Sequence, residues 1–223
     1  MNNLEVLYED NHIIVVVKPP NILSQADNTN DPDMLTIIKK YLKEKYNKPG
    51  NVYLGLVHRL DRPVSGVMVF AKTSKAASRL SDQVRTHTFK KTYLAVVNGI
   101  LKKDSDELVD YIVKQNDNSS KISVKEEGKI AKLRYQVLER NYDENLTLVK
   151  VYLETGRHHQ IRVQMANIGH VLYGDQRYGK QDKNQIALFS NSLEFVHPVK
   201  KETLKIEKEL PNFGIWKVFK SVK

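Results

Sequence analysis

Two short apolar runs enclose a polar loop in the stretch Tyr53-Leu-Gly-Leu-Val57-His58-Arg59-Leu60-Asp61-Arg62-Pro63-Val64-Ser65-Gly66-Val67-Met68-Val69-Phe70-Ala71-Lys72. Residues 53–57 and 67–71 are rich in apolar side chains and are bounded by glycine and proline, which predicts two strands. Strands that fix a charged loop at a surface often hold catalytic side chains. The alternative is a solvated turn in which Asp61 only pairs with an arginine, and composition alone favours that alternative.

The bulk composition is typical of a globular protein. The chain has 223 residues, of which 40% are hydrophobic and 28% are charged, so a single domain or a closely joined pair is expected. No run approaches the roughly 18 apolar residues of a membrane span, and residues 1–12 lack the pattern of a signal peptide. The absence of cysteine excludes disulfides and thiolate metal sites. We expect a cytoplasmic protein.

The net charge of +10 bears on the partners of the chain. A polyanion, nucleic acid first and an acidic membrane second, is the expected partner, although a lysine-rich solvated surface gives the same count. Residues 74–100 carry a larger excess of basic over acidic residues than the chain average. Their charged residues are Lys75, Arg79, Arg85, Lys90 and Lys91 against the single acid Asp82.

Hydrophobic periodicity predicts three helices. Asp31 is the expected cap of the first, with Pro32 in its first position and Pro49-Gly50 after its end. Ser74 is expected to open the second, and the third is expected over residues 158–168. Strands are predicted at residues 4–8, 13–17, 92–97, 108–114, 121–125, 130–139, 147–153, 188–189, 193–196 and 204–206. These elements predict an α+β fold with a mixed, largely antiparallel sheet and flanking helices.

A carboxylate can act as a nucleophile on a sugar or on an activated ring, provided that it stays ionised while partly desolvated. A neighbouring arginine meets both needs, because it lowers the carboxylate pKa by about one to three units. Arg162 is the candidate partner of Asp61, since it lies beside the apolar stripe of the third predicted helix. An Asp–Arg pair is also a routine structural feature, so this pattern alone leaves both interpretations open.

Other side chains are weaker candidates. Tyr93 lies on a predicted strand after the basic helix, where it either stacks on an unpaired base or packs in the core. His58 lies three residues before Asp61, and His158 and His159 are adjacent, so their side chains are expected to diverge on a helix. That spacing is poor for metal ligation. Gly174 to Gly179 matches no phosphate-binding loop and is interpreted as a tight turn.

Several separated motifs together resemble the RluA-like pseudouridine synthases. The segment His58 to Gly66 resembles the signature loop of that family. Further similar segments follow the family's order and cover nearly the whole chain: Val15 to Pro20, Lys91 to Ala95, Gly156 to Arg162, Ile168 to His170, Gly174 to Gly179 and Phe195 to Pro198. One departure is His158, where the family usually has threonine.

The resemblance implies the catalytic fold of that family, with a central RNA-binding cleft, and isomerisation of uridine in ribosomal or transfer RNA. Asp61 is then the catalytic residue, Arg162 pairs with it, and Tyr93 stacks on the base and helps remove the proton from carbon 5. Arg59 enters the space left by the flipped nucleotide. The implied RNA-binding residues are His58, Arg59, Arg62, Arg157, His159 and Gln160.

The resemblance also bears on organisation and partners. Residues 1–223 are expected to form a single catalytic domain, without the separate N-terminal RNA-binding domain of many relatives. A monomer that binds RNA, but no membrane, metal or nucleotide cofactor, is expected. Two alternatives stay open: a non-catalytic RNA-binding or RNA-chaperone protein, and a metal-dependent phosphodiesterase that uses the histidines.

Overall fold

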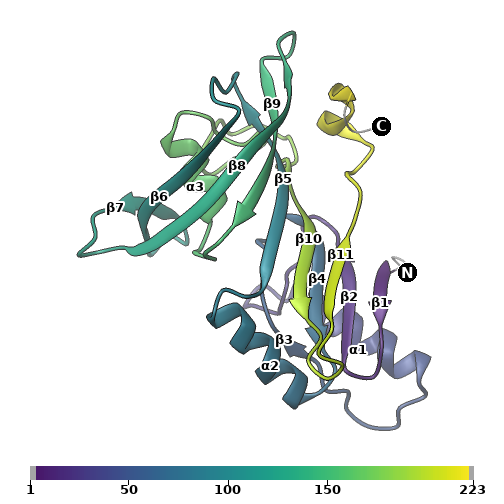
Figure 1. Ribbon diagram of the computed structural model, residues 1–223. Coiled ribbons are helices and arrows are strands. Elements are labelled where there is room, and N and C mark those ends of the chain that lie inside the picture. Colours follow the sequence, from purple (N-terminus) through teal and green to yellow (C-terminus); the bar gives the residue numbers. More distant parts are fainter. Residues whose placement is uncertain (1–3, 221–223) are drawn as a thin grey trace. The chain divides into compact units, whose positions relative to one another are not determined.

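The computed structural model describes residues 4–220 and divides into two compact units (Figure 1). The first unit contains the chain up to Lys90 and returns for Ser192–Lys208. The second contains Lys91–Asn191 and the segment from Glu209 onward. The sequence predicted one domain or a closely joined pair, and each unit is described below on its own.

The strands of the first unit follow the order β1-β2-β4-β10, with β3 paired to β4 and β11 paired to β10. The β1–β2, β2–β4, β3–β4 and β10–β11 pairings are antiparallel. The bounds are β1 Val6–Glu9, β2 Ile13–Lys18, β3 Gly55–Leu56, β4 Ser65–Ala71, β10 Leu188–Val196 and β11 Thr203–Glu207. The strand expected at residues 53–57 is therefore reduced to two residues, while β10 joins the two late strands that were expected separately.

Helices α1 (Met34–Lys45) and α2 (Ser74–Arg85) belong to the first unit. The cap of α1 is Asp33, whose carboxylate accepts a hydrogen bond from the Thr36 amide, so the prediction of Asp31 as the cap was wrong. Ser74 opens α2 as predicted, and Thr73 caps it by accepting a hydrogen bond from the amide of Ala76. The error at α1 is a short displacement, because several residues before the helix can serve as its cap.

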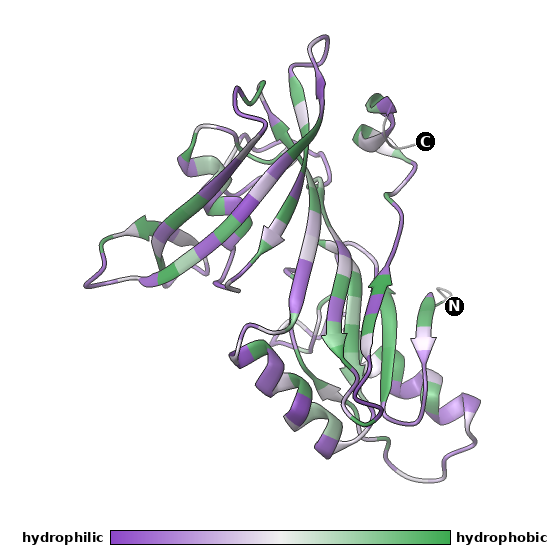
Figure 2. Ribbon diagram, in the orientation of Figure 1, coloured by the Kyte–Doolittle hydropathy of each residue, from purple (hydrophilic) through white to green (hydrophobic). Residues whose placement is uncertain are grey.

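The core of the first unit lies between α2 and the sheet. Its members are apolar side chains of β2, β4, α2 and β10, together with Phe89 from the connection after α2: Ile13, Val15, Val67, Val69, Ala71, Ala76, Leu80, Phe89, Leu193 and Phe195. Figure 2 shows β2 and β4 as mainly hydrophobic strands, whereas α1 and α2 alternate hydrophilic and hydrophobic bands. This amphipathic pattern is what allowed the helices to be predicted from spacing.

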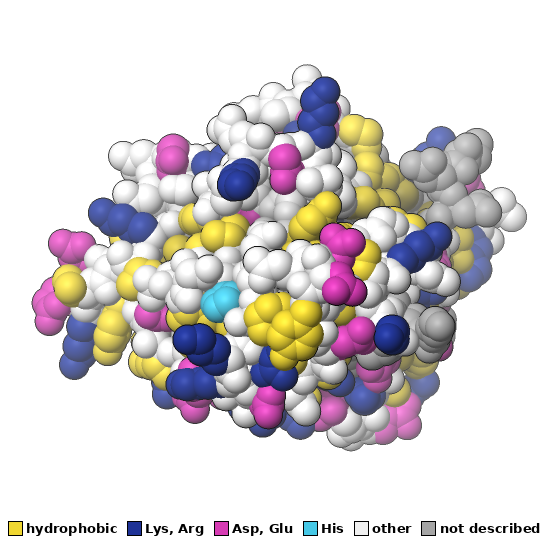
Figure 3. Space-filling view, turned by 90° about the horizontal axis from the view of Figure 1, so that it is seen from above, with side chains coloured by type: hydrophobic (Ala, Val, Ile, Leu, Met, Phe, Trp, Pro, Cys, Tyr) yellow, Lys and Arg dark blue, Asp and Glu magenta, His cyan; other side chains and the backbone are white. Residues whose placement is uncertain are grey.

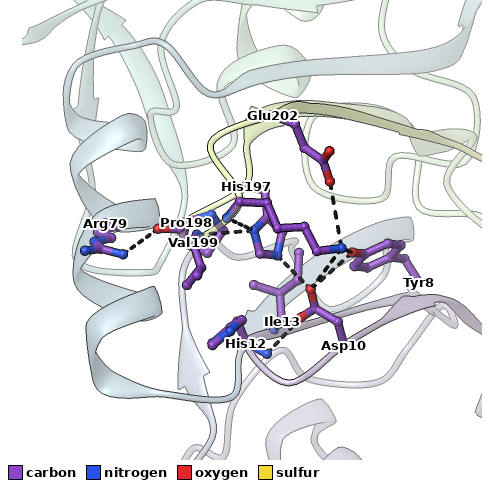
Figure 4. Close-up of polar contacts among 10 residues, drawn as sticks. Tyr8, Asp10, His12, Ile13, Arg79, His197, Pro198, Val199 and Glu202 are labelled. Carbon is purple, nitrogen blue, oxygen red and sulfur yellow. Dashed lines mark hydrogen bonds and ion pairs between the residues drawn. The ribbon is translucent and has the colours of Figure 1, made fainter.

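A polar network joins two turns of the first unit that are far apart in sequence (Figure 4). His197 is fully buried, and its Nε2 lies 2.8 Å from Oδ2 of Asp10. The Nδ1 atom accepts hydrogen bonds from the amides of Val199 and Lys200 at 3.2 and 2.9 Å. The proton of the neutral ring is therefore on Nε2, which donates it to Asp10. Asp10 in turn accepts from the amide of Ile13 at the start of β2.

The strands of the second unit follow the order β10-β5-β9-β8-β6-β7. The β5–β9, β9–β8, β8–β6 and β6–β7 pairings are antiparallel. The bounds are β5 Lys90–Asn98, β6 Ser105–Lys114, β7 Ser120–Ser123, β8 Lys129–Asn141 and β9 Leu146–Leu153. Together with the few helices, these pairings confirm the predicted α+β class and its largely antiparallel sheet.

Helix α3 (Gln160–Asn167) contacts β6 and β7, and all residues from Gln160 to Met165 are buried. It begins two residues later than predicted, because His159 has a φ of 53° and cannot continue a right-handed helix. A 3-10 helix over Gly214–Val218 places Trp216 on a second apolar cluster with Leu94, Val96 and Phe189. Over residues 4–220, no helix is both long and apolar enough to cross a bilayer.

Candidate active site

Lys18 braces the loop that carries Asp61. It is the last residue of β2, its side chain is fully buried, and its ammonium donates three hydrogen bonds. The acceptors are the carbonyls of Pro19 (3.0 Å), Arg62 (3.0 Å) and Val64 (2.7 Å). One buried cation therefore holds the backbone on the C-terminal side of Asp61 against the end of β2.

Opposing effects act on the pKa of the Lys18 ammonium. Burial lowers the pKa of Lys18 to about 7, the Asp61 carboxylate raises it, and the guanidinium of Arg62 lowers it. Three carbonyl acceptors match the three protons of an ammonium group, which favours the charged form. The ammonium that fixes the loop thus also interacts electrostatically with the candidate catalytic carboxylate.

Ser24 fixes the N-terminal side of the same loop. Its hydroxyl donates to the carbonyl of Leu60 at 2.7 Å and accepts from the Leu60 amide at 3.1 Å. The side chains of Leu60 and Val64 are buried on either side of Asp61, and the Val64 amide donates to the Asp61 carbonyl at 3.0 Å. Asp61, itself half-buried, is therefore presented by backbone that is tied down at both ends.

The predicted RNA-binding side chains of this loop lie in different surroundings. Arg59 is exposed and makes no ion pair or hydrogen bond within residues 4–220. Arg62 is exposed and pairs with Asp31 at 2.8 Å. His58 is only 8% exposed, accepts a hydrogen bond from the Val69 amide on Nε2, and lies beside the ring of Phe89. His58 therefore holds the loop to β4, and its contact with RNA stays a prediction.

Tyr93 and Arg162 both belong to the second unit, whereas Asp61 belongs to the first. Tyr93 lies on β5 opposite Val151 of β9 and is 6% exposed. Arg162 lies in the first turn of α3 and is equally buried. The expected pairing of Arg162 with Asp61 stays a prediction.

The carboxylate that the structure describes beside Arg162 is Asp175. Nε and Nη2 of Arg162 donate to the two oxygens of Asp175 at 2.8 and 2.7 Å, a bidentate and fully buried pair. Burial alone would raise the pKa of Asp175, but Arg162 and the amides of Arg177 and Tyr178 outweigh it, so that pKa lies below its ordinary value. The pair fixes the guanidinium on a rigid helix.

The predicted tight turn around Asp175 is confirmed. Gly174 has a φ of 70°, and a Cβ there would clash with the Gln185 carbonyl oxygen, so only glycine fits. The Gly179 amide donates to the Asp175 carbonyl at 2.9 Å and closes the turn. The turn thereby places the Asp175 side chain against Arg162 of α3.

The turn before α3 orients the remaining predicted residues. His158 and His159 stack at a centroid distance of 3.9 Å, so the expectation that they diverge was wrong, because neither lies in the helix. Nδ1 of His159 lies 2.9 Å from the Tyr178 hydroxyl, which accepts from the Ser120 amide and so can donate its own proton to the ring. Nδ1 of His158 lies 3.0 Å from the Ser120 hydroxyl.

Gln160 and Arg157 are held by main-chain groups. Gln160 is 3% exposed; its amide oxygen accepts from the Thr155 hydroxyl and the Arg157 amide, and its nitrogen donates to the Lys132 carbonyl. The half-buried Arg157 donates from Nε to the Ile130 carbonyl. Gln160 therefore shapes the turn, and contact of either side chain with RNA stays a prediction.

The basic stretch 74–100 is largely engaged within the protein. Arg79 donates to the Pro198 carbonyl at 2.6 Å, Arg85 pairs with Asp82, and Lys90 pairs with Glu194 at 2.6 Å. Figure 3 shows lysine and arginine side chains spread over the visible face, with acidic side chains among them. Three of the five basic residues of this stretch are thus already engaged by groups of the protein.

Three residues that hold the candidate site in place were not predicted from the sequence: Lys18, Asp175 and Tyr178. Each stands in a segment that resembles the family, yet their contacts reach 46, 13 and 19 residues along the chain. A lysine that ends a strongly apolar strand was the available signal, because such a lysine is buried with the strand. Among the described residues, no three His, Asp or Glu side chains gather in a metal-holding arrangement.

Comparisons with known proteins agree with these features. A profile of the RNA pseudouridylate synthase family matches residues 12–167. A Bacillus subtilis relative named Uncharacterized RNA pseudouridine synthase YhcT is 35% identical over 211 residues, which are 93% of this chain and 69% of the relative. A Pseudomonas aeruginosa relative named Ribosomal large subunit pseudouridine synthase D is 34% identical and covers 96% of this chain and 70% of its own length.

Solved structures show the same fold. Human RNA Pseudouridylate Synthase Domain Containing 4 superposes with a TM-score of 0.77 over 93% of this chain and 88% of the human chain, at 21% identity. The match of residues 12–167 spans both the Asp61 loop and Arg162 on α3. The chain belongs to the RNA pseudouridylate synthase family, in its RluA-like branch, and is an isomerase of RNA uridines.

Proposed function

We propose that the chain converts particular uridines of ribosomal or transfer RNA to pseudouridine, with Asp61 as the catalytic residue. The observation that carries this proposal is the fixed presentation of Asp61 beside the buried ammonium of Lys18. A half-buried carboxylate that is held at both ends of its loop has the rigidity that nucleophilic catalysis requires.

The reaction exchanges one bond of the uracil for another. Asp61 acts on the target nucleotide as the bond between N1 and the ribose breaks. The detached uracil then turns, its carbon 5 forms the new bond to the ribose, the proton on carbon 5 is lost, and N1 gains a proton. We assign Tyr93 to stacking on the uracil and to removal of that proton, and Arg162 to pairing with Asp61.

RNA contacts are assigned by exposure. Arg59 is exposed and has no hydrogen-bond or ion-pair partner within residues 4–220, which suits a side chain that fills the space of a flipped nucleotide. We assign Arg62, Arg157 and His159 to phosphate or sugar contacts. His58 and Gln160 act through the backbone that they hold.

The proposed substrate follows from the relatives. Those from Pseudomonas aeruginosa and Nitrosomonas europaea are both named Ribosomal large subunit pseudouridine synthase D. Large-subunit ribosomal RNA is therefore the first substrate to test, and transfer RNA the second. We propose that a monomer acts on them in the cytoplasm without a metal or a nucleotide cofactor.

Tritium release from RNA labelled at carbon 5 of uracil tests the proposal directly. The RNA is taken from cells that lack the protein, separated into ribosomal and transfer fractions, and assayed with a strong chelator present. The wild-type protein should release tritium without cutting the RNA. Asp61→Asn should release none while its affinity for RNA changes little, and Asp143→Asn, an exposed change in the β8–β9 loop, should behave as the wild type.

Two outcomes would decide against the proposal. Equal release by Asp61→Asn would remove Asp61 from the mechanism. RNA binding without release from either fraction would favour the second candidate, a protein that binds or remodels RNA without modifying it.

A further inference from the structure

Lys91 stands close to the candidate catalytic tyrosine but outside the roles assigned above. It lies two residues before Tyr93 on β5, so both side chains leave the same face of the strand, with their Cα atoms about 7 Å apart. Its partner across the β5–β9 ladder is Leu153, the last residue of β9 before the turn that leads to α3. Lys91 therefore lies beside both Tyr93 and that turn.

The ammonium of Lys91 reaches a glycine of this turn. A Cβ added to Gly156 would lie 3.0 Å from Nζ of Lys91. Gly156 is exposed, whereas the Lys91 side chain is partly buried. Because Gly156 has no side chain, it leaves Nζ of Lys91 accessible from that side.

No group within residues 4–220 compensates this charge. Within residues 4–220, Lys91 makes no ion pair and no hydrogen bond, whereas the buried ammonium groups of Lys18 and Lys72 have carbonyl and carboxylate partners. Burial lowers the pKa of Lys91. A desolvated cation without a partner costs free energy, so its retention calls for an anion from outside the chain.

We propose that Lys91 binds a phosphate of the RNA backbone beside the uridine that stacks on Tyr93. This inference rests on the proposed function, since it takes Tyr93 as the platform for the target base. Lysine suits the role because its compact charge binds phosphate without a fixed geometry. The phosphate supplies the missing counter-charge, and the open position at Gly156 gives it access to Nζ.

A phosphate-binding lysine and a structural lysine predict opposite effects on stability. Lys91→Met removes an uncompensated charge, so the thermal midpoint of the free protein should stay the same or rise while RNA binding weakens. A structural lysine would lower the midpoint on removal. Lys102→Met is the matched control, because Lys102 is exposed and follows the far end of β5.

The test measures binding in the Asp61→Asn background, so that turnover does not enter. Both lysine variants are titrated with the unmodified ribosomal and transfer RNA fractions from about 50 to 300 mM KCl. Lys91→Met should raise Kd about three- to tenfold at low salt and reduce the slope of log K against log salt by about one. Lys102→Met should change neither quantity.

The outcomes separate this inference from the proposed function. Unchanged Kd and slope for Lys91→Met would overturn the phosphate contact, and so would a lowered thermal midpoint accompanied by weaker binding. If Lys91→Met lowers the slope but the wild type releases no tritium, the contact stands and the catalytic proposal fails. If the wild type releases tritium and Lys91→Met binds normally, only the contact fails.

Discussion

The ammonium of Lys18 donates a hydrogen bond of 2.7 Å to the carbonyl of Val64, 46 residues further along the chain. The same group reaches the Arg62 carbonyl, so the loop that presents Asp61 depends on one buried side chain from another strand. This arrangement links the stability of the fold to the position of the candidate catalytic carboxylate.

Lys18→Met should damage activity more than folding. The change leaves buried carbonyls without a donor, each costing about 1–3 kcal/mol, while removing the cost of burying a cation, so the free energy of unfolding should fall by only about 1–3 kcal/mol. Tritium release should fall at least about tenfold at temperatures where the variant is folded, because Asp61 loses its fixed position. Denaturant unfolding and the release assay check the two parts. Release equal to that of Lys102→Met would show that the brace is dispensable.

Asp175→Asn removes the negative charge of Asp175 while nearly preserving the size of its side chain, so it tests what that charge contributes. The substitution removes the negative charge from the buried bidentate pair with Arg162, and breaking a buried pair costs about 3–5 kcal/mol. We expect a lower denaturation midpoint and, in the folded variant, weaker tritium release, because the guanidinium is no longer fixed on α3. Asp143→Asn, an exposed loop change, is the control. Full stability of Asp175→Asn would mean that other groups hold Arg162.

Local sequence patterns predicted which helices and strands form better than they predicted the residues at which these elements begin and end. The apolar spacing of α2 and the alternation in β9 located both correctly. The cap of α1 was misplaced by two residues, since Asp31, Pro32 and Asp33 are all compatible with a helix start. The side chain that bonds the Thr36 amide decides between them, and its geometry is not encoded in residue type alone.

Contacts between distant segments explain what was missed at the candidate site. The motif around Arg162 was recognised, but its bidentate contact with Asp175 depends on the turn at Gly174. The stacking of His158 and His159 depends on the positive φ of His159, which residue type does not dictate. Motifs therefore located the chemistry, whereas the groups that brace it required the three-dimensional structure.

Glu9 should make the stability of the first unit sensitive to acid. Its carboxylate accepts hydrogen bonds from Lys45 (2.7 Å), Lys72 (2.8 Å) and Tyr46 (2.7 Å), and its side chain is 7% exposed. Burial raises the pKa of Glu9, but these three partners together lower it from 4.5 to about 2. The stabilisation is therefore present above pH 4.5 and is lost as the pH falls toward 2.

A comparison with Glu9→Gln isolates this contribution. At neutral pH the variant should be less stable than the wild type by at most about 3 kcal/mol, and the difference should shrink between pH 4.5 and about 2. Chemical denaturation at several pH values measures it. Glu44→Gln changes an exposed helix residue and should show a small, nearly constant difference. A Glu9→Gln difference that stays constant with pH would contradict the assignment.

His197 and Asp10 should be energetically coupled although 187 residues separate them. The buried imidazole joins the turn after β10 to the turn before β2, and its proton on Nε2 points at a carboxylate (Figure 4). Hydrogen bonds to charged groups contribute about 1.5–3 kcal/mol, so a double-mutant cycle of Asp10→Ala and His197→Ala should give a coupling energy in that range.

A second cycle provides the comparison for this coupling. Asp10→Ala combined with Asp143→Ala pairs the Asp10 change with an exposed change in the β8–β9 loop, so their effects on unfolding should add within about 0.5 kcal/mol. If the His197 cycle is equally additive, the imidazole acts only through the amides of Val199 and Lys200. Loss of the β10–β11 turn would then explain the whole effect of His197→Ala. A coupling energy clearly above the control instead means that one buried histidine connects the turn after β10 to the turn before β2, the strand that ends at Lys18.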